Sequence, residues 1–296
     1  MISLHSHSGQ HCLHAKGKLE EVVLRAIELG FDTYGLSEHV PRSRLQDLYP
    51  EEAALTCEEL ARMFKEYVVE ARRLQAKYAD SITILVGAET ELIHSESLDE
   101  LDQLRAAVPL DYLVGSVHHV AGYALDFDVP RYREAEAACG GAEGLFCAYF
   151  DAQEEMLRRV QPLVVGHFDL VRLFNPNCTL SEDVWTRIRR NVDTILAYDG
   201  LVEINSRAWK KGLQDAYPQR DILQYMMTRG VKFTLSDDSH GPADVGMHYD
   251  KLHSYLIEMN IKTVYRPIRA PDGTVTTQTI ENTQEHPFWM ALRSRV

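Results

Sequence analysis

Short apolar runs alternate with amphipathic stretches about seven times along the chain, and this order constrains the fold more than any other feature. Amphipathic spacing predicts helices, for example over residues 18–29 and 56–78, where apolar side chains recur every three or four positions. The intervening runs predict strands at residues 1–4, 32–37, 81–86, 112–117, 163–165, 201–204 and 231–235. Such alternation is typical of parallel strands joined by crossover helices.

Two helix starts carry the pattern of a capping box, in which a threonine stands three residues before a glutamate. Thr56 precedes Glu59, and Thr179 precedes Glu182. We therefore expect helices to begin at these two threonines, the second of them ending near Tyr198.

Histidine or acidic residues follow almost every predicted strand, at or just beyond its last residue. In barrels and in open α/β sheets, the carboxyl ends of the strands carry the active site. A closed barrel brings these ends to one point, whereas an open doubly wound sheet spreads them along an edge. The sequence therefore predicts a TIM-like α/β barrel with its active site at the C-terminal ends of the strands.

The net charge restricts the partners of the protein. Lysine plus arginine number 31 and aspartate plus glutamate 44, which gives a formal charge of −13. Such a surface repels nucleic acid and anionic membranes. No apolar run reaches the roughly 18 residues that a membrane span needs. We therefore expect a small-molecule substrate, and a phosphate-bearing one would need local positive charge, most simply metal ions.

The cysteines and the chain length indicate the compartment and the domain organisation. The five cysteines are odd in number and form no C-x-x-C motif, which indicates reduced thiols in a cytoplasmic protein. A chain of 296 residues could form two domains, but α/β barrels of this length are often single. We expect one domain over residues 1–296, with an insertion at about residues 120–144.

The residues that follow the strands have the chemistry of metal ligands. His5-x-His7 and Asp238-x-His240 are pairs at a spacing of two, which in an extended segment points both side chains the same way. Imidazole is the commonest metal ligand near neutral pH. The candidate ligands are His5, His7, His11 or His14, His39, Glu89, His118, His167, Asp238 and His240.

The number of these ligands predicts more than one metal ion. Zinc takes about four or five ligands, fewer than the candidates present. We therefore expect two to three divalent ions that share a bridging carboxylate. Nitrogen and oxygen ligands fit zinc, manganese or iron, and we prefer zinc. Clustered metals beside a phosphate ester can hold its oxygens and lower the pKa of a bound water.

Three neighbouring side chains bear on the ligand set. Cys12 lies inside the histidine cluster, where it could touch a metal. His119 and Asp237 adjoin His118 and Asp238, and the period-two geometry of extended chain turns adjacent side chains to opposite faces. We therefore exclude His119 and Asp237 as ligands.

Six motifs occur in a fixed order: His5-Ser-His7, Glu38-His39, Glu89, Ser116-Val117-His118, Gly166-His167 and Ser236-Asp237-Asp238-Ser239-His240. In this order they resemble the polymerase-and-histidinol-phosphatase (PHP) superfamily, from residue 1 to about residue 265. Within it, the chain is most similar to the monofunctional histidinol-phosphatases. This similarity rests on Gly115-Ser-Val-His118, Gly166-His-Phe-Asp-Leu170, Glu203-Ile-Asn205-Ser206, Trp209-Lys210-Lys211-Gly212 and Tyr217-Pro218.

The resemblance implies a distorted (β/α)7 barrel with a trinuclear metal centre. By position, the first metal would take His5, His7, Glu89 and Asp238. The second metal would take Glu89 as a bridge, His118 and His167. The third metal would take His14, His39 and His240. We prefer His14 over His11 because the fungal-type enzymes resemble this chain in reaching a histidine at that position.

The implied activity is metal-dependent hydrolysis of L-histidinol phosphate to L-histidinol and phosphate, a step of histidine biosynthesis. We expect Glu89, Asp238 and His240 to be catalytic as well as metal-binding. Among the cations, Arg172 aligns with a phosphate-binding arginine of the family. Lys210 aligns with a second expected cation, and Arg207 is close enough to compete with it.

Other functions stay open at this stage. A PHP phosphoesterase could act on another small phosphomonoester, such as a nucleotide or a sugar phosphate, whereas the charge of −13 disfavours a DNA end. A metal-binding regulatory relative without activity would normally lack several ligands. An amidohydrolase-like deacylase also begins with H-x-H but expects different histidine spacing. The sequence does not indicate the oligomeric state.

Overall fold

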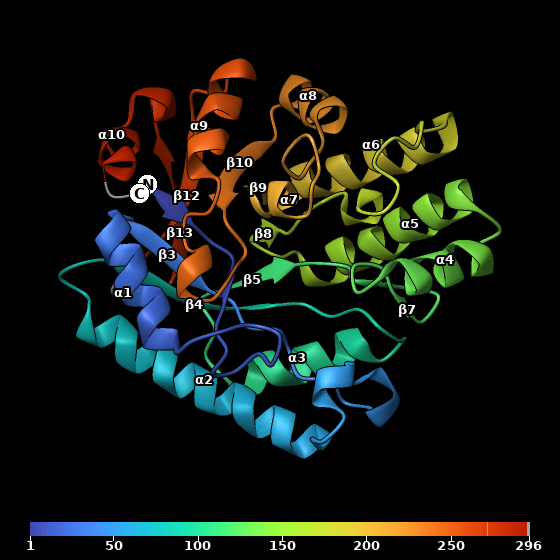
Figure 1. The fold of residues 1–296 in the computed structure, drawn as a ribbon, viewed down its shortest axis with the longest axis horizontal. Helices are drawn as coiled ribbons and strands as arrows, with labels where there is room; N and C mark the ends of the chain where they lie inside the picture. Colours follow the sequence, from blue (N-terminus) through green and yellow to red (C-terminus); the bar gives the residue numbers. More distant parts are fainter. Residues whose placement is uncertain (271, 295–296) are drawn as a thin grey trace.

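The computed structural model describes residues 1–270 and 272–294. Its centre is a sheet of seven parallel strands in the order β1, β3, β4, β5, β8, β9 and β10. Their bounds are Ile2–Ser3, Thr33–Leu36, Thr83–Glu89, Tyr112–Gly115, Val164–Val165, Leu201–Asn205 and Lys232–Ser236. All seven predicted strands are present, and they follow one another around the sheet in chain order (Figure 1).

The sheet curls into a nearly closed barrel because its last strand returns to its first. The amide of Leu4, directly after β1, donates to the carbonyl of Leu235 in β10 at 3.2 Å. Farther along, β2 (Ser6–His7) pairs in parallel with β11 (Ser239–His240), and His7 lies opposite His240. The predicted seven-stranded barrel is confirmed. Its closure places the two spaced pairs of predicted ligands, from opposite ends of the chain, side by side.

Helices surround the barrel (Figure 1). Outside the predicted insertion, the long ones are α1 (Leu19–Leu29), α2 (Cys57–Lys77), α3 (Ser97–Ala107), α5 (Ala142–Val160), α6 (Glu182–Ala197), α8 (Arg220–Arg229) and α9 (Tyr249–Glu258). A short helix, α7 (Arg207–Lys210), follows β9. Within the described part of the chain, no helix is both long and apolar enough to cross a membrane.

One tyrosine fills much of the barrel interior. Tyr112 packs with the buried side chains of Leu4, Leu85, Val114 and Val164. Its hydroxyl donates to the carbonyl of Leu4 at 2.7 Å, which ties β5 to the strand that closes the barrel.

Two glycines make room for this ring. A Cβ atom at Gly35 would lie 2.1 Å from the hydroxyl of Tyr112, and one at Gly87 would lie 2.4 Å from its ring. Both contacts are shorter than any van der Waals contact, so the ring and the two glycines are required together.

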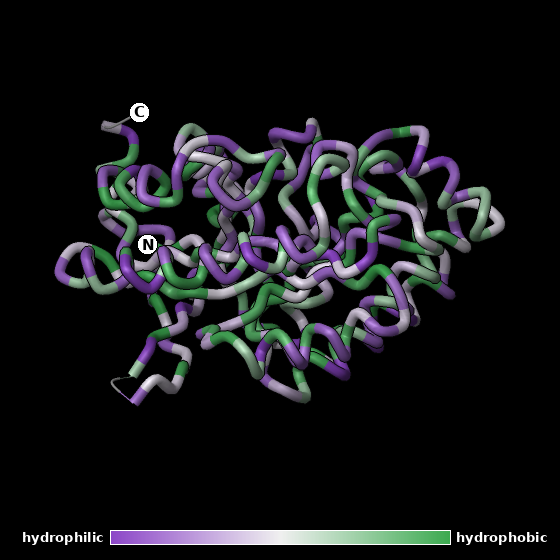
Figure 2. Tube along the Cα trace, turned by 90° about the horizontal axis from the view of Figure 1, so that it is seen from below, coloured by the Kyte–Doolittle hydropathy of each residue, from purple (hydrophilic) through white to green (hydrophobic). Residues whose placement is uncertain are grey.

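The predicted insertion and the polar C-terminal region both contain regular structure. Residues 120–144 include most of a small hairpin, β6 (His119–Val120) with β7 (Tyr123–Ala124), and the helix α4 (Val129–Ala138). After the barrel, β12 (Val264–Arg269) pairs antiparallel with β13 (Val275–Ile280), and α10 (Phe288–Arg293) follows. The β12–β13 hairpin extends from the body of the molecule (Figure 2).

The two predicted helix starts have different outcomes. The capping box at Thr56 is confirmed, because its side chain accepts from the amide of Glu59 and the Glu59 carboxylate accepts from the amide of Thr56. The prediction at Thr179 is wrong: α6 begins at Glu182, and Ser181 is its N-cap. The competing signal lay two residues closer to the helix, where serine is an equally good cap.

Candidate metal centre

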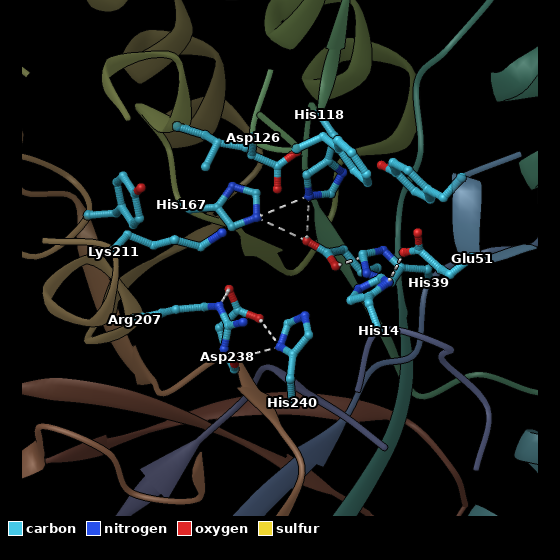
Figure 3. Close-up of a pocket in the computed structure, with 15 residues that line it drawn as sticks. His14, His39, Glu51, His118, Asp126, His167, Arg207, Lys211, Asp238 and His240 are labelled. Atoms are coloured by element: carbon cyan, nitrogen blue, oxygen red, sulfur yellow. Dashed lines mark hydrogen bonds and ion pairs between the residues drawn. The ribbon is translucent and has the colours of Figure 1, made fainter. Parts of the chain in front are cut away.

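The predicted ligands converge in one pocket at the C-terminal ends of the strands (Figure 3). His5 and His7 lie beneath it and are almost fully buried. The other predicted ligands line the pocket wall: His14, His39, Glu89, His118, His167, Asp238 and His240.

Glu89, the last residue of β4, lies at the centre of the cluster and is 1% exposed. Its Oε2 atom lies 3.1 Å from Nε2 of His5, 3.3 Å from Nε2 of His7 and 3.1 Å from Nδ1 of His39. Its Oε1 atom lies 3.0 Å from Nε2 of His167 and 3.3 Å from Nε2 of His118. The two oxygens therefore face different sets of imidazoles, which is the arrangement a bridging carboxylate needs.

Asp238 supplies the second central carboxylate. Its Oδ1 atom lies 3.7 Å from Nε2 of His5, 3.5 Å from Nε2 of His7 and 3.5 Å from Nδ1 of His240. His5, His7 and Asp238 place one ligand atom each within 4.8 Å of one another, as do His5, Glu89 and His167. The first group belongs to the expected first site. The second shares Glu89 and His167 with the expected second site, whereas His118 forms a group with His39 and Glu91.

A third group forms at the pocket mouth from His14, His39 and His240, again with ligand atoms within 4.8 Å of one another. His11 lies elsewhere, with its ring 5.8 Å from that of Tyr67, and it belongs to none of the groups found in the described residues. This placement favours His14 over His11.

Cys12 borders the third group. Its Sγ atom lies 3.2 Å from Nε2 of His14, and with His7 and His39 it forms a further candidate group. The expectation that this thiol could touch a metal therefore stays open.

Several buried ring nitrogens lack a hydrogen bond within the described residues. In the preferred ligand set they are Nε2 of His5, both nitrogens of His7 and of His39, and Nδ1 of His167; outside that set, both nitrogens of His11 and Nδ1 of His119 also lack one. A buried polar atom without a partner costs free energy, which a bound water or ion would relieve. Nitrogens and carboxylate oxygens gathered at this spacing fit divalent metal ions such as zinc.

The charges of the pocket lead to the same conclusion. Burial alone would lower the pKa of the inner histidines, but the carboxylates around them outweigh this effect. They raise the pKa of His7 to about 10 and raise the pKa of His5 and of His118 well above the ordinary range. The cluster therefore attracts positive charge, which metal cations would supply in place of protons.

Three further buried glutamates contact these histidines and were not predicted as site residues: Glu38, Glu91 and Glu203. We call them the outer carboxylates. Glu38 and Glu203 lie within motifs that the resemblance to the PHP superfamily uses, and Glu91 lies two residues after Glu89. This closeness in the sequence was the only indication of their role, since no sequence pattern shows which strands face each other across the barrel.

The predicted phosphate-binding cations divide into two groups. Arg207 lines the pocket, where it donates to the carbonyl of Asp238 at 2.8 Å. Lys210 lies outside the pocket lining and pairs with Asp244 at 2.6 Å. Arg172 also lies outside the lining, buried against Asp221 at 2.9 Å.

A cation that was not assigned from the sequence extends into the pocket instead. Lys211, next to Lys210 in the chain, lines the pocket and points toward its centre (Figure 3). Together with Arg207, it places positive charge beside the ligand cluster.

Part of the pocket wall is acidic and aromatic. Glu51 lies 3.3 Å from Nδ1 of His14, and Asp126 has no hydrogen-bond or ion-pair partner among the described residues. The rings of Tyr49 and Phe127 stack with centroids 6.0 Å apart and planes at 10°. Both rings line the pocket, so this wall presents carboxylates together with flat apolar surface.

The fold and the site together define an α/β barrel with a candidate metal centre at the C-terminal ends of its strands. The PHP domain family matches residues 3–207, and the chain belongs to this family.

Two fungal relatives cover nearly the whole chain. The probable histidinol-phosphatase of Schizosaccharomyces pombe is 46% identical over 294 residues, which are 97% of this chain and 95% of the relative. The histidinol-phosphatase of Saccharomyces cerevisiae is 32% identical over 334 aligned residues, which cover 98% of this chain and 99% of the relative. The resemblance to histidinol-phosphatases is thus confirmed.

Two crystal structures share the fold. The putative histidinol phosphatase of Listeria monocytogenes superposes with a TM-score of 0.73 at 26% identity, covering 85% of this chain and 99% of that one. The histidinol phosphate phosphatase of Lactococcus lactis superposes with a TM-score of 0.66 at 18% identity, and the superposition covers 89% of this chain and 95% of that one. The Lactococcus crystal contains zinc, L-histidinol and phosphate.

Proposed function

We propose that this protein is a histidinol-phosphatase, which hydrolyses L-histidinol phosphate to L-histidinol and phosphate. The near full-length relatives at 46% and 32% identity carry this name. The observation that carries the proposal is that one pocket is lined by the ligand cluster, by the cations Arg207 and Lys211, and by further carboxylates and aromatic rings.

The substrate is itself bipolar. Its phosphate is an anion, while its amine is a cation and its imidazole is a flat ring. The ligand cluster, Arg207 and Lys211 give the pocket a positive end when metal is bound. Asp126 and Glu51 would attract the amine, and the rings of Tyr49 and Phe127 would pack against the imidazole. A nucleotide or a sugar phosphate offers no cation to these carboxylates.

The metal centre is the second part of the proposal. The nine predicted ligands, with His14 in place of His11, would hold two to three divalent ions, and we infer zinc, the metal in the Lactococcus crystal. Such ions would hold phosphate oxygens and lower the pKa of a bound water. Glu89 would link the sites, and Asp238 and His240 would complete them.

The cations would orient the phosphate. We infer that Arg207 and Lys211 contact its oxygens, because both line the pocket, whereas Lys210 and Arg172 are held by Asp244 and Asp221. Arg207 also donates to the backbone carbonyl of Asp238, so one side chain would hold both the segment of a metal ligand and the phosphate of the substrate.

The five cysteines are free thiols, and we infer a cytoplasmic location from them.

A substrate panel tests the proposed function. Phosphate release is measured from L-histidinol phosphate, nucleoside monophosphates and sugar phosphates, and kcat/KM should be highest for L-histidinol phosphate. A higher value for a nucleotide or a sugar phosphate would assign the protein to another small phosphomonoester.

One variant tests the bipolar pocket directly. Asp126→Asn should lower kcat/KM for L-histidinol phosphate about 10-fold, the value of one charge-assisted hydrogen bond. Hydrolysis of p-nitrophenyl phosphate, which has no amine, should stay within about twofold. Equal losses on both substrates would show that Asp126 does not recognise the amine.

A further inference from the structure

The ring of His5 lies between two carboxylate layers. Its Nε2 atom faces inward, 3.1 Å from Glu89 and 3.7 Å from Asp238. Its Nδ1 atom faces outward, 3.2 Å from Glu203. His5 and Glu203 are both fully buried, so bulk solvent does not reach the contact between them.

Two other histidines repeat this arrangement. Nε2 of His118 lies 3.3 Å from Glu89, and its Nδ1 lies 3.3 Å from Glu91. Nε2 of His7 lies 3.3 Å from Glu89, while its Nδ1 lies 3.5 Å from Glu38. In all three rings, the same nitrogen faces the centre and the other faces a separate buried carboxylate.

From this repeated pattern, and resting on the proposed metal centre, we propose that the outer carboxylates Glu203, Glu91 and Glu38 are positioning residues. Glu203 and Glu91 each accept the Nδ1–H of one histidine, and Glu38 faces Nδ1 of His7 at the longer distance of 3.5 Å. Such a contact favours the tautomer whose Nε2 lone pair is free for the metal. Carboxylates in this position also make the imidazole a stronger ligand.

Among the outer carboxylates, Glu203 contacts two segments that carry predicted ligands. Its Oε1 atom accepts from the backbone amide of His167 at 2.7 Å and from the side chain of Asn205 at 2.7 Å. One carboxylate therefore orients the ring of His5 and the strand end that carries His167. His5 belongs to two of the candidate ligand groups and His167 to one of these two, so the loss of Glu203 should affect both groups.

The environments of the outer carboxylates support a role toward the histidines. Glu203 has no lysine or arginine partner among its contacts in the described residues, so histidines are its neighbouring cations. Glu91 also contacts His39 at 3.0 Å and lies 3.7 Å from the buried Arg42. Glu38 is held in place by Ser8, whose amide donates to it at 2.8 Å and whose hydroxyl at 2.7 Å.

The test measures zinc affinity in Glu203→Gln by competition with a chromophoric chelator. Removal of such a carboxylate typically weakens metal binding about 10- to 100-fold, and this loss is expected here. Glu203→Asp, which keeps the charge, should retain more affinity than the glutamine variant. Glu154→Gln is the matched control, because Glu154 is a buried glutamate of α5 that contacts Arg158 and Thr194 instead of the site.

Thermal unfolding separates positioning from a merely structural role. If Glu203 positions ligands, the rise of the unfolding midpoint on adding zinc should shrink in Glu203→Gln. If its role is only structural, the midpoint of the metal-free protein would fall while the zinc-induced rise stayed unchanged. Should this variant fail to fold, Glu91→Gln carries the same two measurements.

The outcomes distinguish this proposal from the proposed function. Zinc affinity within threefold of wild type in both Glu203→Gln and Glu91→Gln would overturn the positioning role and leave the metal centre intact. A wild-type protein that binds no zinc, manganese or iron would overturn the metal centre and, with it, this role.

Discussion

At the scale of single residues, we expect Glu89 to matter most for metal binding and activity. It contacts five histidines, which belong to the groups that would hold separate cations. A neutral amide cannot supply the charge that neighbouring cations need. Loss of a residue that only orients a metal ligand typically lowers metal affinity or activity about 10- to 100-fold. Because Glu89 would itself be a ligand, Glu89→Gln should lower kcat/KM by more than about 100-fold. Steady-state kinetics with metal analysis checks this, and near wild-type turnover would assign the bridge to another carboxylate.

Two adjacent lysines provide a matched pair at the same scale. Lys211 lines the pocket, whereas Lys210 pairs with Asp244. A charge-assisted hydrogen bond contributes about 1.5–3 kcal/mol, so Lys211→Ala should lower kcat/KM about 10- to 150-fold at unchanged metal content. Lys210→Ala should stay within about threefold, since exposed ion pairs contribute little. The reverse order of the two losses would restore Lys210 as the phosphate-binding cation.

At the scale of elements, the strands and the clustered residues at their C-terminal ends could be predicted, because both are local patterns. The identity of the pocket cation could not, because Lys210 and Lys211 are neighbours at the end of the one-turn helix α7. Which of them faces the pocket depends on how α7 packs against the barrel, and packing is not a local pattern. The contact of Glu203 with His5 depends in the same way on which strands face each other across the barrel.

The two threonines at the helix starts supply a prediction for elements. Thr56 caps α2, and loss of an N-cap costs about 0.5–2 kcal/mol, so Thr56→Ala should lower the free energy of unfolding by that amount. Thr179 precedes the true cap of α6, so Thr179→Ala should change stability by less than about 0.5 kcal/mol. Denaturant unfolding measures both, and equal losses would contradict the assigned caps.

At the scale of the whole molecule, the metal centre should reverse the effect of pH on stability. In the metal-free protein, the pKa of His7 is raised from 6.5 to about 10. Protonation of His7 therefore stabilises the fold fully below pH 6.5, and this contribution is lost as pH rises toward 10. Metal binding requires neutral imidazoles, so the stabilisation by zinc should grow over the same range.

Thermal unfolding midpoints measured from pH 6.5 to about pH 9 check the direction of this pH dependence. One series contains excess chelator and the other contains zinc. The upper limit of about pH 9 stays below the raised pKa of His7. The chelated protein should become less stable as pH rises, relative to the zinc-loaded one. Parallel curves would show that the histidine cluster does not exchange protons for metal.

The charge of the whole molecule explains why the site must bring its own cations. A formal charge of −13 repels a phosphate ester, so its attraction has to come from metals and from the few pocket cations. The most direct test strips the protein of metal and titrates zinc back while phosphate release from L-histidinol phosphate is followed. The account predicts no activity without metal and full activity at two to three equivalents per chain. Full activity in the metal-free protein, or at a single equivalent, would contradict it.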